Sequence, residues 1–396
     1  MDPIQQTVDE LRPALLALAQ ELVRIRSYWG EEEEVIRRLE KVMHDLDFDE
    51  VRIDRMGNLL GRIGTGPETL LFDSHVDTVE VADASAWSVP PFDGELRDGL
   101  LYGRGAVDMK SAAAASIYAA VAARRLGLTE GKSVYVSCSV MEEDCDGENL
   151  AHLFDETGLQ PDACVICEPS GNRIALGHKG KAQIRVRTRG VSAHGAAPER
   201  GRNAVYEMAR IIPRVAAQAE RLHGAGRGTL VLSRISSESA SLNAVPYECE
   251  IYLDRRLAPG ETEETVRAEL GEITAGTEAA WETGTLRRTS WTGREIRYEP
   301  LHPPWHISPD APLAQAAAAA FHRAFGRTPE AGDYTYWDFS TNAVTPVARG
   351  IPTIGFGPGD PAMAHMQDEH CPLEQIVEAC RLYTALIGER SAHSRA

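Results

Sequence analysis

The feature that most constrains the fold is an alternation of helical and strand patterns that stops near residue 180 and resumes near residue 300. In the first segment, apolar residues recur at helical spacing, and short β-branched runs lie between the helices. Such alternation is typical of a parallel or mixed sheet with helices on both faces. The predicted helices cover residues 4–26, 33–46 and 109–126, and the predicted strands cover residues 51–54, 59–64, 69–77, 133–141 and 163–169.

The segment that interrupts this alternation has a different order of elements: strand, helix, strand, strand, helix, strand. This is the order of a ferredoxin-like α+β domain. We assign its last strand to TLRRTSW, residues 285–291. The other predicted elements of the segment are strand 182–190, helix 203–222, strands 229–236 and 248–257, and helix 261–274.

After the proline-rich segment 298–305, the alternation of helices and strands resumes. Its predicted elements are helix 311–325, strand 351–359 and helix 373–389. The sequence therefore predicts a discontinuous α/β domain, residues 1–179 and 301–396. A smaller ferredoxin-like domain is inserted at residues 180–300.

Composition excludes several classes of partner. The net charge of -18 opposes binding to nucleic acid or to an anionic membrane. No segment has the ~20 unbroken apolar residues of a membrane helix, and the N-terminus lacks a basic signal region. Seven scattered cysteines suggest no disulfide framework. We therefore expect a cytoplasmic protein that binds neither nucleic acid nor a membrane.

Metal-ligating side chains occur where predicted strands end. His75 and Asp77 are two residues apart on one strand, so both face the same way, as in a metal-bound imidazole oriented by a carboxylate. In an open α/β sheet, ligands bind beyond the carboxyl ends of the strands. The remaining candidates are Asp108, Glu142, Glu143, Glu168 and, far downstream, His365.

These acidic residues imply a cation if they gather at one site, because clustered carboxylates otherwise repel one another or become protonated. Calcium in an EF-hand loop is a poor fit. The twelfth position of a loop that begins at Glu142 is Leu153, where a bidentate glutamate is needed.

Several motifs resemble those of the di-zinc metallohydrolases that include acetylornithine deacetylase, succinyl-diaminopimelate desuccinylase and the aminoacylases. The resemblance covers nearly the whole chain. Within this family, the sequence is most similar to the subgroup labelled selenium-metabolism-linked hydrolases. The motifs are SHVDTV, GRGAVDMK, EED-DG, CEPS, G-SAHGAAPERGRNA, LDRRLAPGE and AH-x-x-x-E.

The resemblance implies a zinc-exopeptidase-like catalytic domain, with a mixed sheet flanked by helices, and an inserted lid and dimerisation domain. It also implies two divalent metal ions, zinc or alternatively cobalt or manganese. Asp108 would bridge the two ions. His75 and Glu168 would bind one of them, and Glu143 and His365 would bind the other.

The same resemblance makes Glu142 the general base and Asp77 the support of His75. His194 would stabilise the oxyanion across the interface of a homodimer. The sequence departs from the family at Asp368, where asparagine is usual, and His370 lies close to that motif.

Two residues, Asn243 and Arg256, are the predicted substrate anchors, on neighbouring strands. Arg255 is the adjacent alternative to Arg256, although strand alternation places it on the other face. A guanidinium can hold a substrate carboxylate through two parallel hydrogen bonds.

The function predicted from the sequence is metal-dependent hydrolysis of the amide bond of an N-acyl amino acid or small dipeptide-like substrate with a free carboxylate. One alternative is an N-carbamoyl-amino-acid amidohydrolase of the same fold. Another is a non-catalytic metal-binding homologue, which the presence of Glu142 argues against.

Overall fold

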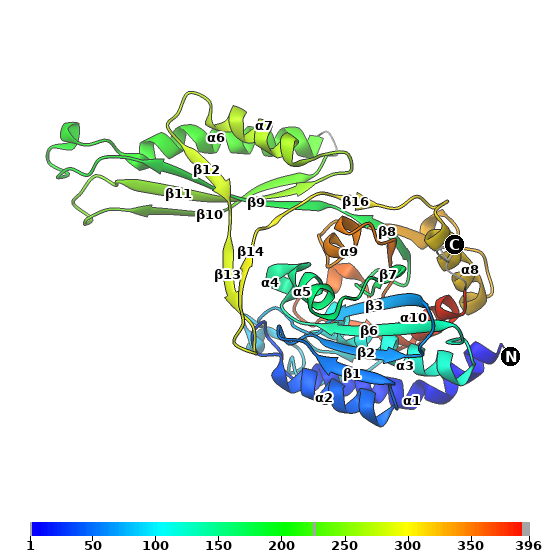
Figure 1. Cartoon of the computed structure of the whole chain (residues 1–396). Coiled ribbons are helices and arrows are strands. Elements are labelled where there is room, and N and C mark those ends of the chain that lie inside the picture. The colour runs from blue at the N-terminus through cyan, green and yellow to red at the C-terminus, as the bar shows by residue number, and fades with distance from the viewer. Residues whose placement is uncertain (1, 225–226, 390–396) are drawn as a thin grey trace.

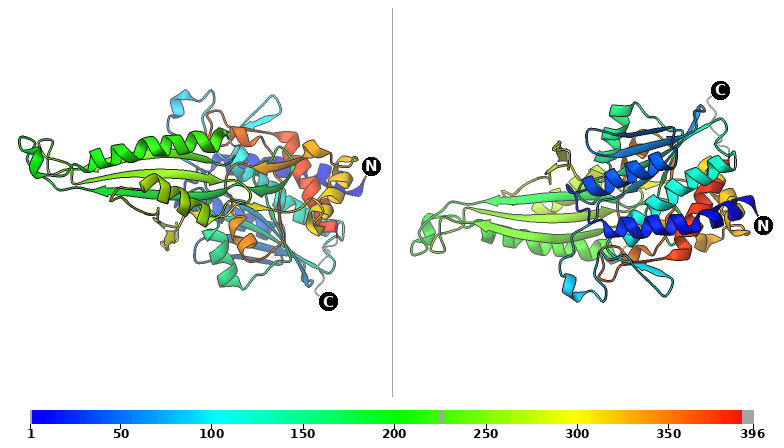
Figure 2. Two further views of the ribbon diagram at one scale, coloured as in Figure 1. Left: turned by 90° about the horizontal axis from the view of Figure 1, so that it is seen from above. Right: turned by 90° about the horizontal axis from the view of Figure 1, so that it is seen from below.

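The protein consists of a rounded α/β body and a long α+β arm that extends from it (Figure 1). The structure is a computed structural model, and it describes residues 2–224 and 227–389. Both chain segments that flank the arm contribute to the body. Figure 2 shows that the first and last described helices, blue and red, lie in the body and away from the tip of the arm.

The body is built on a nine-stranded mixed sheet. Four central strands, β6, β3, β7 and β18, run parallel to one another, so their carboxyl ends lie at the same edge. The strands, in order across the sheet, are β1 (Glu50–Ile53), β2 (Leu59–Ile63), β6 (Lys132–Ser139), β3 (Glu68–His75), β7 (Ala163–Ile166), β18 (Thr353–Gly355), β8 (Ile174–His178) and β16 (Trp305–His306), and β17 (Tyr334–Trp337) pairs with β8.

Helices cover both faces of this sheet because its central strands carry apolar side chains on both faces. In β3, Leu70 and Phe72 join the largest apolar core, while Leu71 between them joins a smaller core on the opposite face. The helices of the larger core are α1 (Pro3–Arg24), α2 (Glu33–Asp45), α3 (Ser111–Arg125), α8 (Pro312–Phe325) and α10 (Leu373–Gly388). The smaller core contains residues of α5 (Glu148–Thr157) and α9 (Val344–Ala348), and α4 (Glu142–Cys145) follows β6.

The arm has a four-stranded antiparallel core sheet of order β10-β11-β9-β12, which is the ferredoxin-like order. Its helices α6 (Ala204–Gly224) and α7 (Glu263–Thr274) pack on one face and form a separate apolar core with the sheet. The strands are β9 (Gly180–Arg189), β10 (Thr229–Glu238), β11 (Glu248–Leu257) and β12 (Ala280–Thr283), and β15 (Leu301–His302) also pairs with β9.

The assignment of TLRRTSW as the last strand of this domain is wrong. Residues 280–283 form β12 instead and pair with β9, whereas β13 (Leu286–Thr289) and β14 (Glu295–Tyr298) form a separate hairpin. The hairpin runs back from the arm to the body (Figure 1), where the Trp291 indole donates to the Gly57 carbonyl at 3.2 Å. The segment with this strand-like pattern therefore belongs to a hairpin that connects the two domains, and it does not complete the arm sheet.

The remaining elements are short. A three-stranded sheet contains β4, β5 and β19, and helical turns occur in loops of both domains. Among the described residues, no helix is both long enough and apolar enough to cross a bilayer. The bounds are β4 (Glu95–Arg97), β5 (Leu100–Tyr102), β19 (His370–Pro372), η1 (Ala84–Ala86), η2 (Ala106–Lys110), η3 (Pro198–Arg200), η4 (Ala331–Asp333) and η5 (Pro361–Met363).

Candidate active site

Three adjacent parallel strands bring predicted ligands to one edge of the sheet. His75 is the last residue of β3, Glu142 and Glu143 open the helix after β6, and Glu168 lies two residues beyond β7. Asp108 precedes α3, and His365 follows η5. All of these except His75 line a cavity of about 300 Å³, together with residues that include Asp146, Lys181, Arg256, Phe339 and Ser340.

Asp108 lies between the two histidines and offers a different carboxylate oxygen to each. Its Oδ1 is 2.9 Å from His75 Nε2, and its Oδ2 is 3.2 Å from His365 Nε2. Glu168 Oε1 approaches His75 Nε2 at 3.5 Å, and Glu143 Oε2 approaches His365 Nε2 at 3.0 Å. The ligand atoms therefore form two groups that share Asp108.

Asp77 holds ligands of both groups through backbone and side-chain contacts. The His75 ring, through Nδ1, faces the Asp77 carbonyl oxygen at 3.0 Å and its carboxylate oxygen at 3.6 Å. The other oxygen of the Asp77 carboxylate accepts from the Glu143 backbone N–H at 3.0 Å. Fixing Nδ1 in this way leaves Nε2 of His75 to face the site, which is the usual role of such a partner.

Glu369 holds the loop that presents Asp108. Its carboxylate accepts hydrogen bonds from the backbone N–H groups of Val107, at 2.8 Å, and Asp108, at 3.1 Å. Arg104 pairs with the other Glu369 oxygen at 2.5 Å. The late glutamate of the AH-x-x-x-E motif is thus a support of the site, a role that the sequence did not predict.

The two residues near His365 that complicated the sequence assignment lie apart from the carboxylate cluster. His370 Nδ1 faces the Asp368 carbonyl oxygen at 2.8 Å, and its ring packs against Tyr102. Asp368 accepts from the Ser88 backbone N–H at 2.7 Å. Of the two histidines, only His365 contacts Asp108 and Glu143.

The backbone is strained at two positions of the site. Met141, immediately before Glu142, has φ 60°, and His365 itself has φ 63°. Side chains other than glycine rarely adopt this left-handed conformation, and such strain concentrates at functional sites. At Met141 the turn ends β6 abruptly and directs the next residue into the cavity.

The carboxylates of this cluster are buried, which makes their negative charges unfavourable unless positive charge lies nearby. Burial raises the pKa values of Glu142 and Glu168 well above their usual range and also raises that of Glu143. Hydrogen bonds to Asp108 and Glu143 raise the pKa of His365 to about 10. Four buried carboxylates beside two imidazoles require either protons or bound cations for neutrality. The donor set of oxygens and imidazole nitrogens fits divalent metal ions.

Glu142 differs from its neighbours because it is not held by other protein groups. Its carboxylate lies within 4.8 Å of the ligand atoms of His75 and Glu168. Within residues 2–224 and 227–389, no group donates a hydrogen bond to this carboxylate, although Glu142 is buried and lines the cavity. It is therefore placed to exchange a proton with a molecule in the cavity.

His194 and Asn243 lie at the outer end of the arm, away from this cavity. Ala244, next to Asn243, forms a β-bridge with His194, and the Gly195 N–H donates to the Asn243 carbonyl at 2.7 Å. At the other end of β9, Lys181 donates to Asp146 in the cavity at 2.9 Å. β9 has ten residues, so the two ends are roughly 30 Å apart at ~3.3 Å per residue.

The prediction that Asn243 and Arg256 sit on neighbouring strands is wrong for Asn243, which is not on a strand. Asn243 is in the loop between β10 and β11, whereas Arg256 is near the opposite end of β11 and lines the cavity. A ten-residue strand separates the hairpin loop from the carboxyl end of β11.

The two adjacent arginines have different environments. Arg255 is fully buried, and its guanidinium donates to Glu261 at 2.7 Å and to Glu269 at 2.9 and 3.0 Å. Arg256 is bonded to Asp254 through Nε, at 2.8 Å, and Nη2, at 3.2 Å. Arg255 therefore stabilises the arm, and Arg256 is the arginine that faces the cavity.

Comparison with known proteins places these observations in one family. Residues 71–389 match the model of peptidase family M20/M25/M40. The chain is 36% identical over 372 residues to uncharacterized protein YgeY of Escherichia coli (strain K12), covering 92% of each chain. It is 31% identical over 391 residues to succinyl-diaminopimelate desuccinylase of Cereibacter sphaeroides (strain ATCC 17025 / ATH 2.4.3), covering 94% of this chain and 97% of that one.

The fold is also found among solved structures. YXEP of Bacillus subtilis, described as a dinuclear metal binding peptidase, superposes with a TM-score of 0.67 at 14% sequence identity. The match covers 96% of this chain and 98% of YXEP. At this low identity, the similarity supports the fold, including the arm, and not a particular substrate.

Proposed function

The chain belongs to peptidase family M20/M25/M40, and we propose that it hydrolyses the amide bond of an N-acyl amino acid or small dipeptide-like substrate with a free carboxylate. The protein is a hydrolase of amide bonds that depends on metal. The observation that carries the proposal is the placement of Asp108 between two groups of ligands, with one oxygen toward each. Beside them, the carboxylate of Glu142 remains free to move a proton.

The residues present can hold two divalent ions. Asp108 would bridge them, with His75 and Glu168 completing one group and Glu143 and His365 the other. We propose zinc as the native metal because imidazole and carboxylate ligands suit it, although cobalt and manganese accept the same donors. When bound, such ions polarise a scissile carbonyl and lower the pKa of a water.

Glu142 would act as the general base and then as the general acid. Its carboxylate takes a proton from the attacking water and returns it to the amide nitrogen as the bond breaks. Asp77 would keep His75 in the orientation that the site needs. Seven free, buried cysteines support a cytoplasmic setting for this chemistry.

We further propose that residues 180–300 form a lid and a dimerisation domain. The strand β10 lies at the edge of the arm sheet and exposes Val231 and Ile235, each to 54%. An exposed apolar edge strand is a template for pairing with another chain. A symmetric dimer formed there would let the arm of one chain carry His194 and Asn243 toward the cavity of its partner.

The local structure of His194 suits a hydrogen-bond donor. The Ala196 backbone N–H donates to His194 Nδ1 at 3.0 Å. In the neutral imidazole, Nδ1 is then the acceptor and Nε2 carries the proton. The side chain is exposed and presents an N–H that can stabilise a developing oxyanion.

Mixing two inactive variants should restore activity if His194 acts in the partner's site. In a heterodimer of Glu142→Gln and His194→Ala chains, one site receives both an intact Glu142 and an intact His194. Random exchange of equal amounts should recover about a quarter of wild-type activity. Hydrolysis rates are measured after exchange of differently tagged chains. Confirmed heterodimers that remain as inactive as the parents would mean that His194 has no role in trans.

Arg256 is the proposed anchor of the substrate carboxylate. The Asp254 carboxylate accepts hydrogen bonds from Nε and Nη2 of Arg256, and this pairing orients the guanidinium toward the cavity. Nη1 of Arg256 has no partner among the described residues, so the outer edge of the guanidinium can hold a carboxylate. Lys181 adds a second cation to the same wall, although Asp146 already neutralises it.

Replacing Arg256 with lysine should lower kcat/KM for an N-acyl amino acid, because lysine cannot form the paired hydrogen bonds of a guanidinium. The expected decrease corresponds to a loss of about 2 kcal/mol in transition-state stabilisation. The corresponding amino-acid amide, which lacks the carboxylate, should lose much less. Initial rates on matched acid and amide substrates make the comparison.

Arg187→Lys is the matched control, because Arg187 pairs with Glu250 at 3.1 Å on the arm sheet and does not line the cavity. Equal losses on the acid and the amide in the Arg256 variant would assign Arg256 a structural role. The carboxylate would then be recognised by another group.

A further inference from the structure

A second cavity lies at the opposite edge of the sheet from the metal-ligand cluster. It has a volume of about 310 Å³, within the range of small-molecule sites, which begins near ~300 Å³. Its walls include Ala163, the first residue of β7, and Thr353, the first residue of β18. Glu168 of the proposed active site follows the other end of β7, so the two cavities are separate.

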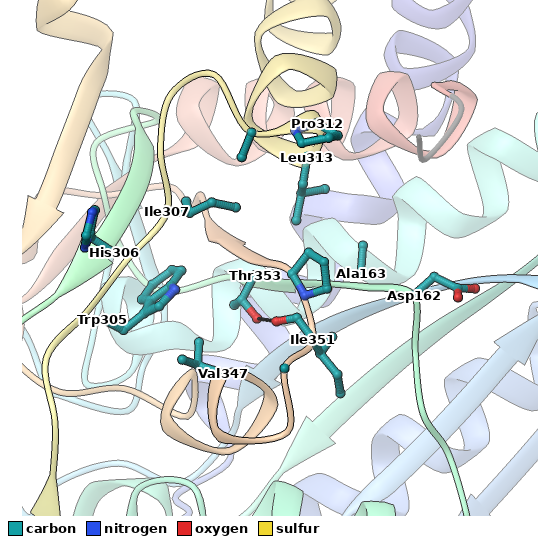
Figure 3. Close-up of a pocket in the computed structure, with 13 residues that line it drawn as sticks. Asp162, Ala163, Trp305, His306, Ile307, Pro312, Leu313, Val347, Ile351 and Thr353 are labelled. Carbon is teal, nitrogen blue, oxygen red and sulfur yellow. Dashed lines mark hydrogen bonds between the residues drawn. The ribbon is translucent and has the colours of Figure 1, made fainter. Parts of the chain in front are cut away.

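The walls of this cavity are largely apolar. Ile307, Leu313, Val347 and Ile351 contribute aliphatic side chains from four different segments, as Figure 3 shows. Asp162 also belongs to the lining, but its carboxylate accepts from the backbone N–H and the hydroxyl of Thr69, at 2.9 and 2.8 Å. In Figure 3 this carboxylate is directed away from the other lining residues.

Trp305 supplies an unpaired polar group to these apolar walls. Trp305 is only 8% exposed, and it lines the cavity. Within the described ranges, no group accepts a hydrogen bond from the indole N–H, and Figure 3 shows the ring nitrogen on the side toward Thr353 and Val347. The ring is largely buried, but its N–H is open to the cavity, so a ligand atom there can accept from it.

The indole is held in place from several sides. The Trp305 backbone pairs with His178 on β8, and its carbonyl accepts from the Tyr336 hydroxyl at 3.0 Å. The ring meets the His178 ring edge-on, at a centroid distance of 5.5 Å and an angle of 90°. A side chain fixed in this way keeps its N–H in one direction.

A second set of donors faces the same cavity at the start of α8. Ala311 is the N-cap of this 14-residue helix and makes no side-chain cap hydrogen bond. The first-turn N–H groups of Leu313 and Ala314 have no acceptor within the helix. Ala311, Pro312 and Leu313 all line the cavity, so the positive end of the helix dipole is directed at it.

We propose that this cavity binds a small, largely apolar molecule that ends in a carboxylate or carboxamide. The carbonyl-type oxygen would accept from the Trp305 indole and from the first turn of α8. The apolar body would contact Val347 and Ile351. The lining contains no lysine or arginine, and its one carboxylate is already bonded to Thr69. The site therefore selects an acceptor group and disfavours an ammonium group.

Indole NMR on the full-length, metal-loaded protein tests this proposal with hexanoate, hexanamide and hexylamine as probes. The protein has six tryptophans, and Trp305→Phe identifies the Trp305 N–H signal. Hexanoate and hexanamide should shift this signal in a saturable way, while hexylamine should not. The binding constants are measured by calorimetry on the same samples.

Two variants separate this cavity from the metal-ligand cluster, which can also bind carboxylates. Val347→Phe fills the cavity and should abolish the shift of the Trp305 signal. Trp305→Phe keeps most of the wall and should weaken hexanamide binding by about 3- to 10-fold, the value of one hydrogen bond. Binding that is unchanged in both variants, or a Trp305 signal that no probe shifts, would overturn the proposal.

Discussion

Replacing Glu142 with glutamine should leave the metal content of the protein unchanged and lower kcat by about 10²–10⁴-fold, the usual contribution of a general base. Glutamine has nearly the same shape, so the cavity is preserved, but it cannot accept the proton of the attacking water. The loss should be at the upper end of this range if the same carboxylate also protonates the leaving amine. Metal analysis and steady-state kinetics on the same preparation measure both quantities.

A matched control is Glu148→Gln, a change of the same chemistry six residues away. Glu148 opens α5 and does not line the cavity. This variant should retain wild-type kcat. If Glu142→Gln retained wild-type turnover with its full metal content, Glu142 would not be the group that moves the proton.

Replacing Asp108 with alanine should remove both metal ions, because each group of ligands loses one of its members. The loss of affinity should exceed the ~10–100-fold that is typical when only a residue supporting a metal ligand is changed. Activity should be lost together with the metal. The measurement is metal content per chain after gel filtration in metal-free buffer.

Glu143→Ala and Glu168→Ala are the informative comparisons for this variant. Each contacts only one of the two histidines, Glu143 approaching His365 and Glu168 approaching His75. Each of these variants should therefore retain one ion better than Asp108→Ala does. An Asp108→Ala protein that still carries two ions per chain would show that Asp108 does not bridge them.

The strand-end residues that the sequence singled out lie together in the fold because their position follows from topology. His75, Glu142 and Glu168 are far apart in sequence, but each lies at or just beyond the carboxyl end of a parallel strand, and β6, β3 and β7 are adjacent. Parallel neighbours necessarily bring these ends together. His365 required the resemblance to a family, because no strand end near it indicates its position.

The features that the sequence missed depend on contacts between distant segments. The pattern of TLRRTSW is a good strand pattern, but only the pairing of residues 280–283 with β9 decides which segment completes the arm sheet. Asn243 was placed on a strand next to that of Arg256, whereas it lies in the loop before β11, and Arg256 is near the far end of that strand. The alternation of side chains along a strand placed Arg255 and Arg256 on opposite faces, and in the fold only Arg256 of these two lines the cavity.

Supporting residues were the hardest to find from the sequence. Glu369 acts through the backbone N–H groups of Val107 and Asp108, and backbone donors have no sequence signature. Lys181 was also missed, because a lysine at the start of a strand resembles any solvated strand end. Its ion pair with Asp146 across the cavity wall is visible only in the fold.

The central claim is tested most directly by assaying a panel of N-acetyl, N-succinyl and N-carbamoyl amino acids and dipeptides with the metal-depleted protein, as zinc, cobalt or manganese is added back. We expect a free amino acid to be released from an N-acyl amino acid or dipeptide, with no activity before metal addition and full activity at two ions per chain. Release of ammonia and carbon dioxide from N-carbamoyl substrates alone would identify a carbamoyl hydrolase. No hydrolysis of any substrate by protein that carries two ions per chain would contradict the proposed function.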